Sequence, residues 1–129
     1  MTETSPDVEL RIPADSAFLA VLRTATAGLA ARLDFTLDDI EDLRIAVDEA
    51  CALLLKQARS GSDVRCEFRV VDHELGVRAS AECDAPFVPS RDGFSWTVLS
   101  ALTSSVDMNV RDHDLVIDLT RTRGGDEQG

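Results

Sequence analysis

The sequence predicts a single α/β domain arranged as a two-layer sandwich, with helices packed against a sheet. Apolar residues alternate with polar residues in five short segments, as in strands with one buried face, and recur at helical spacing in three others. Because each element has one apolar face, packing helices on the sheet buries both sets of faces. The 129 residues contain no internal repeat or linker, which favours one domain.

The first half of the chain predicts a strand followed by two helices. The strand covers residues 8–12 and stops at Pro13, and a first helix of about 16–32 follows it. Thr36 can cap the second helix, because its hydroxyl accepts from free amides of the first turn. This long, strongly patterned helix is expected to end at the glycine-containing breaker 60–62.

The second half predicts two hairpins separated by a loop and a short helix. These segments are the strands 64–70 and 75–83, the loop 84–92, the helix 94–102 and the strands 106–110 and 115–119. The domain is expected to span 8–121, between a flexible N-terminus at 1–7 and a disordered tail at 122–129.

Charge and composition exclude several function classes. A formal charge of −11 would repel a phosphate backbone, so direct binding to nucleic acid is not expected; the charge favours solubility and would also speed encounter with a basic protein surface. Residues 1–7 are polar and acidic, and no apolar run reaches membrane-spanning length. We therefore expect a cytoplasmic protein without a membrane segment.

The cysteines and histidines do not form a recognisable catalytic or metal-binding pattern. Cys51, Cys66 and Cys83 form no CxxC pair and are odd in number, so they are expected to be buried thiols. His73 and His113 fall in separate turns without partners at ligand spacing, so no metal site is expected. The sequence contains no recognisable Ser-His-Asp or thiolate arrangement.

Two segments carry a resemblance to a known family. The second helix contains DLRIAVDEAC at 42–51, and the third contains FSWTVLSAL at 94–102. With the order of elements over 8–121, they resemble the RsbW and SpoIIAB anti-sigma factor kinases, most closely their actinobacterial branch. This resemblance implies a Bergerat-type ATPase fold of the histidine-kinase-like (GHKL) superfamily. In that fold a five-stranded mixed sheet is covered on one face by three helices, here with a short or degenerate ATP lid.

The resemblance also implies partners. Members of this family hold sigma factors away from RNA polymerase, typically as dimers, and are displaced by a small anti-anti-sigma protein with a STAS domain. Many phosphorylate that antagonist on serine or threonine with Mg-ATP. The expected partners are therefore a sigma factor, an anti-anti-sigma protein and a second copy of the chain.

The second helix carries the principal candidate residues. By resemblance, Glu49 occupies the position of the general base, a role that suits a carboxylate in phosphoryl transfer; composition alone would make it a surface glutamate on an acid-rich helix. One turn later the family has an asparagine that helps to hold Mg²⁺. Here that position is Leu53, which supplies no oxygen to a hard cation.

The loop before the third helix carries the remaining nucleotide positions. By resemblance Asp84 matches the aspartate that reads adenine, although an aspartate beside prolines is also an ordinary loop residue. Pro86 stands where the family has a glycine, and it has no amide donor. Of the glycines expected in the phosphate-contacting segment only Gly93 remains, and it could equally serve a simple turn.

Arg23 and Trp96 are the candidates for protein contacts. By resemblance Arg23 matches an arginine on the first helix that touches both the sigma factor and the antagonist, and its place off the apolar stripe predicts an outward guanidinium. An exposed arginine is also common on any surface. Trp96 could be a core residue or an interface anchor, with the core favoured.

Three hypotheses follow. The first is an anti-sigma factor whose ATP and Mg²⁺ site is weak or lost. The second is an active Mg-ATP-dependent serine/threonine kinase of the antagonist, with Glu49 as base. The third is a domain that retains its fold only for dimerisation or signalling. Leu53 discriminates most sharply between the first two.

Overall fold

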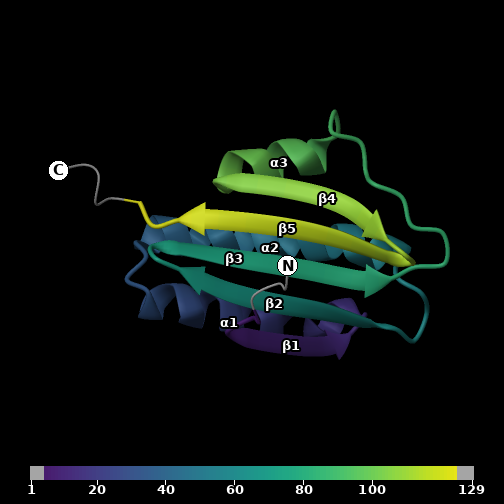
Figure 1. The fold of residues 1–129 in the computed structure, drawn as a ribbon, viewed down its shortest axis with the longest axis horizontal. Helices are drawn as coiled ribbons and strands as arrows, with labels where there is room; N and C mark the ends of the chain where they lie inside the picture. The colour runs from purple at the N-terminus through teal and green to yellow at the C-terminus, as the bar shows by residue number, and fades with distance from the viewer. Residues whose placement is uncertain (1–4, 125–129) are drawn as a thin grey trace.

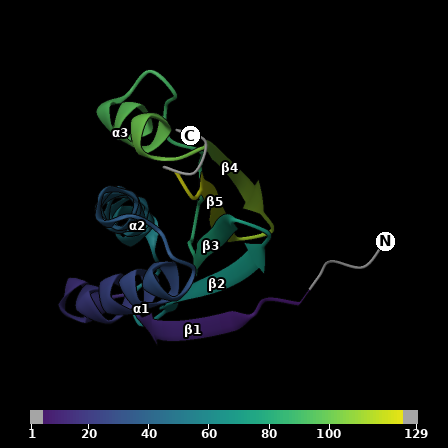
Figure 2. The same ribbon diagram turned by 90° about the vertical axis from the view of Figure 1, so that its left-hand side faces the viewer.

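The computed structural model describes residues 5–124, which form a sheet of five strands and a layer of helices. In chain order the elements are β1 (Val8–Pro13), the short 3-10 helix η1 (Ser16–Phe18), α1 (Leu19–Arg32), α2 (Leu37–Gln57), β2 (Asp63–Val71), β3 (Glu74–Glu82), α3 (Phe94–Leu102), β4 (Ser105–Arg111) and β5 (Asp114–Thr122). The three α-helices cover one face of the sheet and leave the other open (Figures 1 and 2). The two-layer sandwich is therefore confirmed.

The expectation of a mixed sheet was wrong. The strand order is β1-β2-β3-β5-β4, and every neighbouring pair is antiparallel. Two helices lie between β1 and β2, so the chain enters β2 in the opposite direction. The single helix between β3 and β4 makes those two strands parallel, but β5 inserts between them and pairs antiparallel with both.

The start of α2 follows the predicted capping. Thr36 Oγ1 accepts a hydrogen bond from the Asp39 amide at 3.1 Å and caps α2, as expected. The end of α2 comes earlier than the predicted breaker, because Ala58 adopts an extended conformation and bridges Cys83 after β3. This bridge ties the end of α2 to the sheet.

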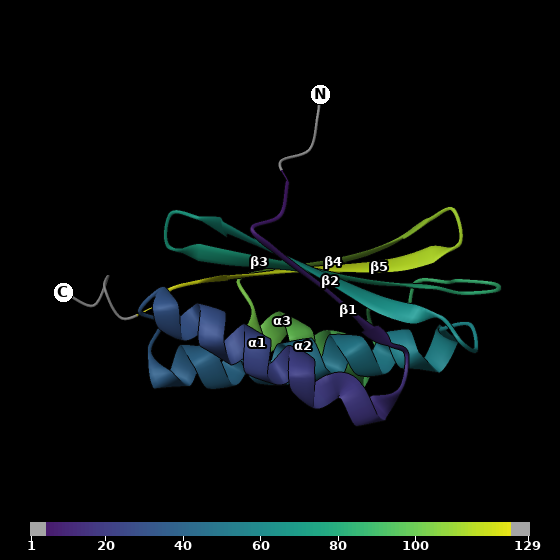
Figure 3. The same ribbon diagram turned by 90° about the horizontal axis from the view of Figure 1, so that it is seen from below.

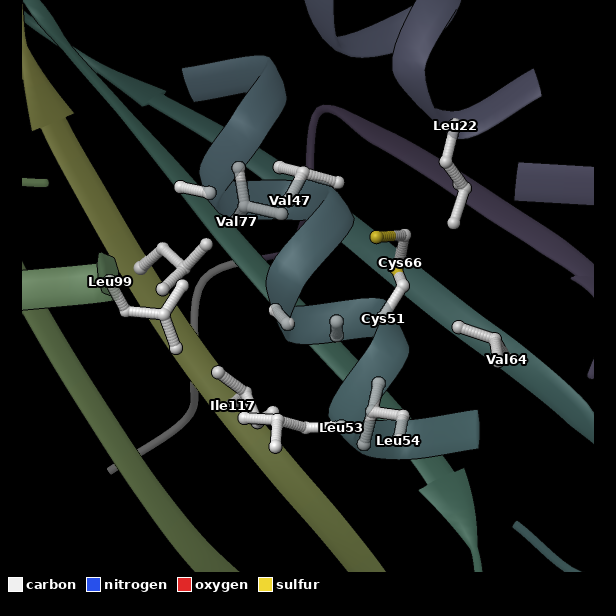
Figure 4. Packing of buried hydrophobic residues seen from close by; sticks show 14 of the residues in the cluster. Leu22, Val47, Cys51, Leu53, Leu54, Val64, Cys66, Val77, Leu99 and Ile117 are labelled. Carbon is white, nitrogen blue, oxygen red and sulfur yellow. The ribbon is translucent and has the colours of Figure 1, made fainter. Parts of the chain in front are cut away.

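The core lies between the sheet and the helices, as Figure 3 shows from below. Its largest fully buried apolar side chains come from α1, α2, α3 and three strands: Leu22, Leu43, Val47, Leu54, Val64, Phe68, Leu75, Leu99, Leu115, Ile117 and Leu119. The cysteines are buried as predicted, and Cys51 of α2 lies beside Cys66 of β2 (Figure 4). The hydrogen bond with Cys51, together with burial, raises the pKa of the Cys66 thiol, so this thiol stays protonated.

The C-terminal end of β5 is fastened to the start of α2. Arg121 Nη2 lies 2.6 Å from Asp39 Oδ1 and 3.2 Å from Asp42 Oδ2, and Arg121 Nη1 donates to the Leu102 carbonyl at 2.6 Å. The Gly124 amide donates to Asp39 Oδ2 at 2.8 Å. Asp39 is 4% exposed, so this is a nearly buried charge held by a full set of partners.

Hydrogen bonds and strand structure continue just past both ends of the range 8–121. At the N-terminal end, the Asp7 amide donates to the Phe68 carbonyl at 2.8 Å and its carboxylate accepts from the Val70 amide. At the other end β5 continues to Thr122, and the Gly124 amide donates to Asp39. Residues 1–4 and 125–129 of the expected flexible segments lie outside the described residues. Across 5–124, the helices are too short or too polar to cross a bilayer.

Candidate functional site

Glu49 lies at the contact between α2 and α3. Its side chain is half-buried, and Ser95 Oγ in the first turn of α3 donates to Glu49 Oε2 at 2.5 Å. Composition alone would make Glu49 a surface glutamate, but α3 covers this side of α2 (Figure 2). The carboxylate therefore faces a helix N-terminus, where negative charge is favoured.

Leu53, one turn after Glu49, belongs to the core. Its side chain is 7% exposed, and Figure 4 shows it beside Ile117 of β5. By contrast Ile45, one turn before Glu49, is 43% exposed. The apolar residues one turn before and one turn after Glu49 thus lie in different environments, and the position of Leu53 offers no oxygen ligand.

Asp84 follows β3 and is engaged by an arginine from the end of α2. Arg59 Nε donates to Asp84 Oδ1 at 2.8 Å, and Arg59 Nη1 lies 3.1 Å from Glu82 Oε2. The Asp84 side chain is 81% exposed. Hydrogen bonding to Asp84, reinforced by the charge of Glu82, raises the pKa of Arg59. Asp84 is thus turned toward solvent and Arg59.

The loop between Asp84 and α3 is attached to the C-terminal end of α2. The Gln57 side chain donates to the Phe87 carbonyl and accepts from the Phe87 amide, both at 3.0 Å. Gly93 is the N-cap of α3 with φ −83°, a conformation open to any residue, and a Cβ there would lie 3.4 Å from the Ser90 carbonyl oxygen. Neither a left-handed turn nor a close backbone approach requires glycine at this position.

Arg23 connects α1 to α2. Its Nε donates to Asp48 Oδ1 at 2.8 Å, and the arginine side chain is 39% exposed. The guanidinium is therefore partly exposed and also paired within the chain, rather than simply directed outward. It borders a shallow groove of about 450 Å³, whose other lining residues are Ala20, Thr24, Ala27, Gly28 and Arg44.

The structure brings some candidates together and separates others. Glu49 contacts Ser95 in the first turn of α3, the helix that Gly93 caps, while Arg23 binds α2 from α1 through Asp48. Asp48 and Glu49, adjacent in sequence, bind different neighbours, because successive helical residues point about 100° apart. Sequence reasoning assigned no role to Ser95; a hydroxyl in the first turn of the third helix was the only available signal.

The remaining candidates occupy structural positions. Trp96 is partly buried against the core, and the Arg91 guanidinium lies 4.4 Å from its ring centroid. His73 and His113 are exposed in the tight turns of the β2–β3 and β4–β5 hairpins, as predicted for turn residues. In both turns the preceding aspartate adopts a positive φ.

Comparison with known proteins gives a local similarity. No protein-family model matches the chain. A stretch of 43 residues is 42% identical to part of the serine-protein kinase RsbW of Bacillus thuringiensis (strain Al Hakam). Matches of the same length and identity occur in RsbW of Bacillus cereus (strain B4264) and Bacillus anthracis (strain A0248). The stretch covers 33% of this chain and only 27% of each relative's length, and it supports a relationship to RsbW.

Proposed function

We propose that this chain is an anti-sigma factor of the RsbW type, in its actinobacterial form. It binds an alternative sigma factor of the stress or sporulation type as a cytoplasmic homodimer, through a histidine-kinase-like domain. An anti-anti-sigma protein with a STAS domain releases the sigma factor, because the two partners exclude one another and compete by mass action. The observation that carries the proposal is the local match to RsbW.

The proposal includes a nucleotide site that no longer supports Mg-ATP chemistry. Three contacts support this part: Leu53 packs in the core, Asp84 is held by Arg59, and Glu49 accepts a hydrogen bond from Ser95. An intact site would need an oxygen ligand at position 53 and an aspartate free to read a base. The side chains present do not fit Mg-ATP, so the proposed activity is binding.

Arg23 is proposed as an anchor for the protein partner, beside the groove on α1. Replacing Arg23 with alanine is expected to weaken capture of the sigma factor at least about tenfold, because a planar guanidinium at an interface pairs with carboxylates through two hydrogen bonds. The measurement is titration of purified stress-type and sporulation-type sigma factors of the source organism against the full chain, with and without the antagonist.

Arg32→Ala is the matched control for that titration. Arg32 ends the same helix, is exposed, and forms no ion pair or side-chain hydrogen bond within residues 5–124. We expect this variant to bind as the native protein does. If both variants lose the same affinity for the sigma factor, the loss comes from the change in net charge and not from a specific contact of Arg23. If the native chain binds no sigma factor, the proposed function is refuted.

A kinase of the antagonist is the second candidate, favoured by the half-buried Glu49 at the start of α3 and by the name of the RsbW relatives. We expect no transfer of phosphate from Mg-ATP to a purified antagonist, measured with labelled γ-phosphate. If transfer occurs and Glu49→Gln abolishes it while Glu41→Gln on the exposed face of α2 does not, the kinase assignment replaces the binding assignment.

A further inference from the structure

The open face of the sheet is hollowed near one end. A cavity of about 350 Å³ lies where β2 and β5 begin and β3 ends, on the side away from the helices (Figures 1 and 3). Its volume falls in the range of small-molecule sites, about 300–1,000 Å³. Such sites are usually lined by apolar side chains, but here every lining residue except Gly61 and Ala81 is polar or charged. The cavity therefore suits an ionised ligand rather than an apolar one.

One wall of the cavity is a row of basic and hydroxyl side chains. The strand register places Arg11 of β1 opposite Arg65 of β2, and Arg65 opposite Ser80 of β3. Val64, next to Arg65, is buried on the helix side, so alternation along the strand directs this row to the open face. Arg65 reaches only Glu9, at 4.0 Å, and Arg11 forms no side-chain hydrogen bond or ion pair within residues 5–124. This wall therefore offers two cations with donors to spare.

The other wall is a row of carboxylates. Glu82 at the end of β3 lies opposite Asp114 at the start of β5, and Asp63, the first residue of β2, extends the same row. Glu82 is paired with Arg59 at 3.1 Å, whereas Asp63 and Asp114 form no ion pair within the described part of the chain. The acidic row is displaced by two residues along the strands from the arginine row, a separation of about 7 Å.

The two rows hold opposite charges apart within one cavity. Across residues 5–124, neither Arg11 nor Arg65 forms an ion pair with an acid of the facing row. A simple anion would meet the carboxylates and a simple cation would meet the arginines, and both contacts are repulsive. A ligand that carries both charges, a short distance apart, pairs with both walls. The rows therefore select a small zwitterion.

Ser62 adds a second, independent feature to this cavity. It lines the cavity, and its Oγ is buried without a hydrogen-bond partner within the described residues. Buried hydroxyl groups in proteins are nearly always hydrogen-bonded, because leaving one without a partner costs free energy. A polar group of a bound ligand would satisfy this hydroxyl.

We propose that the cavity binds a free α-amino acid in its zwitterionic form. The α-carboxylate accepts hydrogen bonds from the guanidinium groups of Arg65 and Arg11, and the α-ammonium donates to the carboxylates of Asp63 and Asp114. Both ionised groups are attached to one carbon atom, and a charge-assisted hydrogen bond of about 2.8 Å at each end lets them span the distance between the rows. The serine hydroxyls of the cavity are left for the amino-acid side chain.

The probe for this site is L-glutamine, whose only ionised groups are the α-carboxylate and the α-ammonium and whose side chain can pair with serine hydroxyls. The test is a titration of the isotope-labelled full chain, followed through its backbone amide NMR signals. We expect a dissociation constant on the order of 1 mM, with the largest shifts at residues 62–65, 80–82 and 114. N-acetyl-L-glutamine lacks the ammonium and L-glutaminamide lacks the α-carboxylate, so each should bind at least about tenfold more weakly.

Two variants assign each charge of the ligand to its wall. Arg65→Gln should weaken glutamine binding about tenfold and remove the preference for glutamine over glutaminamide, because the α-carboxylate has lost its partner. Asp114→Asn should weaken binding to a similar extent and remove the preference over N-acetylglutamine instead. A variant that only disturbed the fold would weaken all three compounds alike and would leave both preferences in place.

Arg32→Gln on α1 and Asp38→Asn on α2 are the matched controls, since both side chains are exposed and lie on the helix layer. Each makes the same change in net charge as its counterpart and should leave binding unchanged. The inference is overturned if glutamine causes no shift at about tenfold above the expected constant, if either derivative binds as tightly as glutamine, or if the shifts lie on the helix layer. These titrations contain no sigma factor, so their result and that of the proposed function are obtained independently.

Discussion

Replacing Asp39 with asparagine is expected to lower the free energy of unfolding by about 3 kcal/mol. The substitution removes the charge that faces Arg121 Nη2 at 2.6 Å and weakens the bond from the Gly124 amide. The Arg121 side chain is only 18% exposed, so its guanidinium would lose its closest partner in a poorly solvated place. Removing one partner of a buried ion pair leaves the other charge buried and unpaired. This costs more stability than replacing both partners with apolar residues of similar size.

Urea unfolding of the two proteins measures this difference, with Asp38→Asn as the matched control. Asp38 lies in the same first turn of α2 but is exposed, so its loss should change the unfolding free energy by less than about 0.5 kcal/mol. If the two variants unfold alike, the Asp39 network does not hold the C-terminal end of β5 to α2.

The Asp39 network also makes stability depend on pH. Burial alone would raise the pKa of Asp39, but hydrogen bonds from Arg121 and the Gly124 amide lower it below the ordinary value of 3.8. A carboxyl whose pKa is lower in the folded state stabilises the fold above its ordinary pKa, and this contribution is lost as the pH falls through the folded pKa. In acid titrations below about pH 4, Asp39→Asn should therefore lose less stability than the native protein.

Much of the fold could be predicted because its elements follow local patterns. Period-two alternation gave both hairpins, and the Thr36 cap placed the start of α2 correctly. The antiparallel character of the whole sheet could not be read locally. The antiparallel pairing depends on the position of β5 between β3 and β4. The alternation of apolar and polar residues within a strand does not indicate which strands lie next to it.

The candidate site was harder to predict because its contacts join distant segments. Glu49 and Ser95 are 46 residues apart, and Asp39 and Arg121 are 82 apart, so no spacing in the sequence connects them. A helical wheel also could not tell that α3 covers the side of α2 that carries Leu53. Packing between α1, α3 and the sheet buries residues around much of α2, Leu53 among them, and the apolar spacing of one helix does not reveal such neighbours.

Leu53→Asn should destabilise the protein by about 4 kcal/mol and should not create Mg-ATP binding. The change restores the residue type found at this position in the resembling kinases. In this chain, however, the side chain is 7% exposed and packs toward Ile117. An amide there loses the packing of the leucine, and its donors and acceptors are buried without partners, which adds to the cost.

Ile45→Asn is the matched control for this substitution, because it exchanges a side chain of the same size on the same helix at a site that is 43% exposed. We expect it to cost less than about 1 kcal/mol. Urea unfolding gives both free energies, and calorimetric titration with Mg-ATP gives binding. Suppose that Leu53→Asn is as stable as Ile45→Asn and gains Mg-dependent affinity for the nucleotide. Position 53 then opens onto a nucleotide site, and the proposal that this chain has lost metal ligation is wrong. If Leu53→Asn unfolds early and binds nothing, core packing has replaced metal ligation at this turn of α2, and the loss of the asparagine cannot be reversed by one substitution.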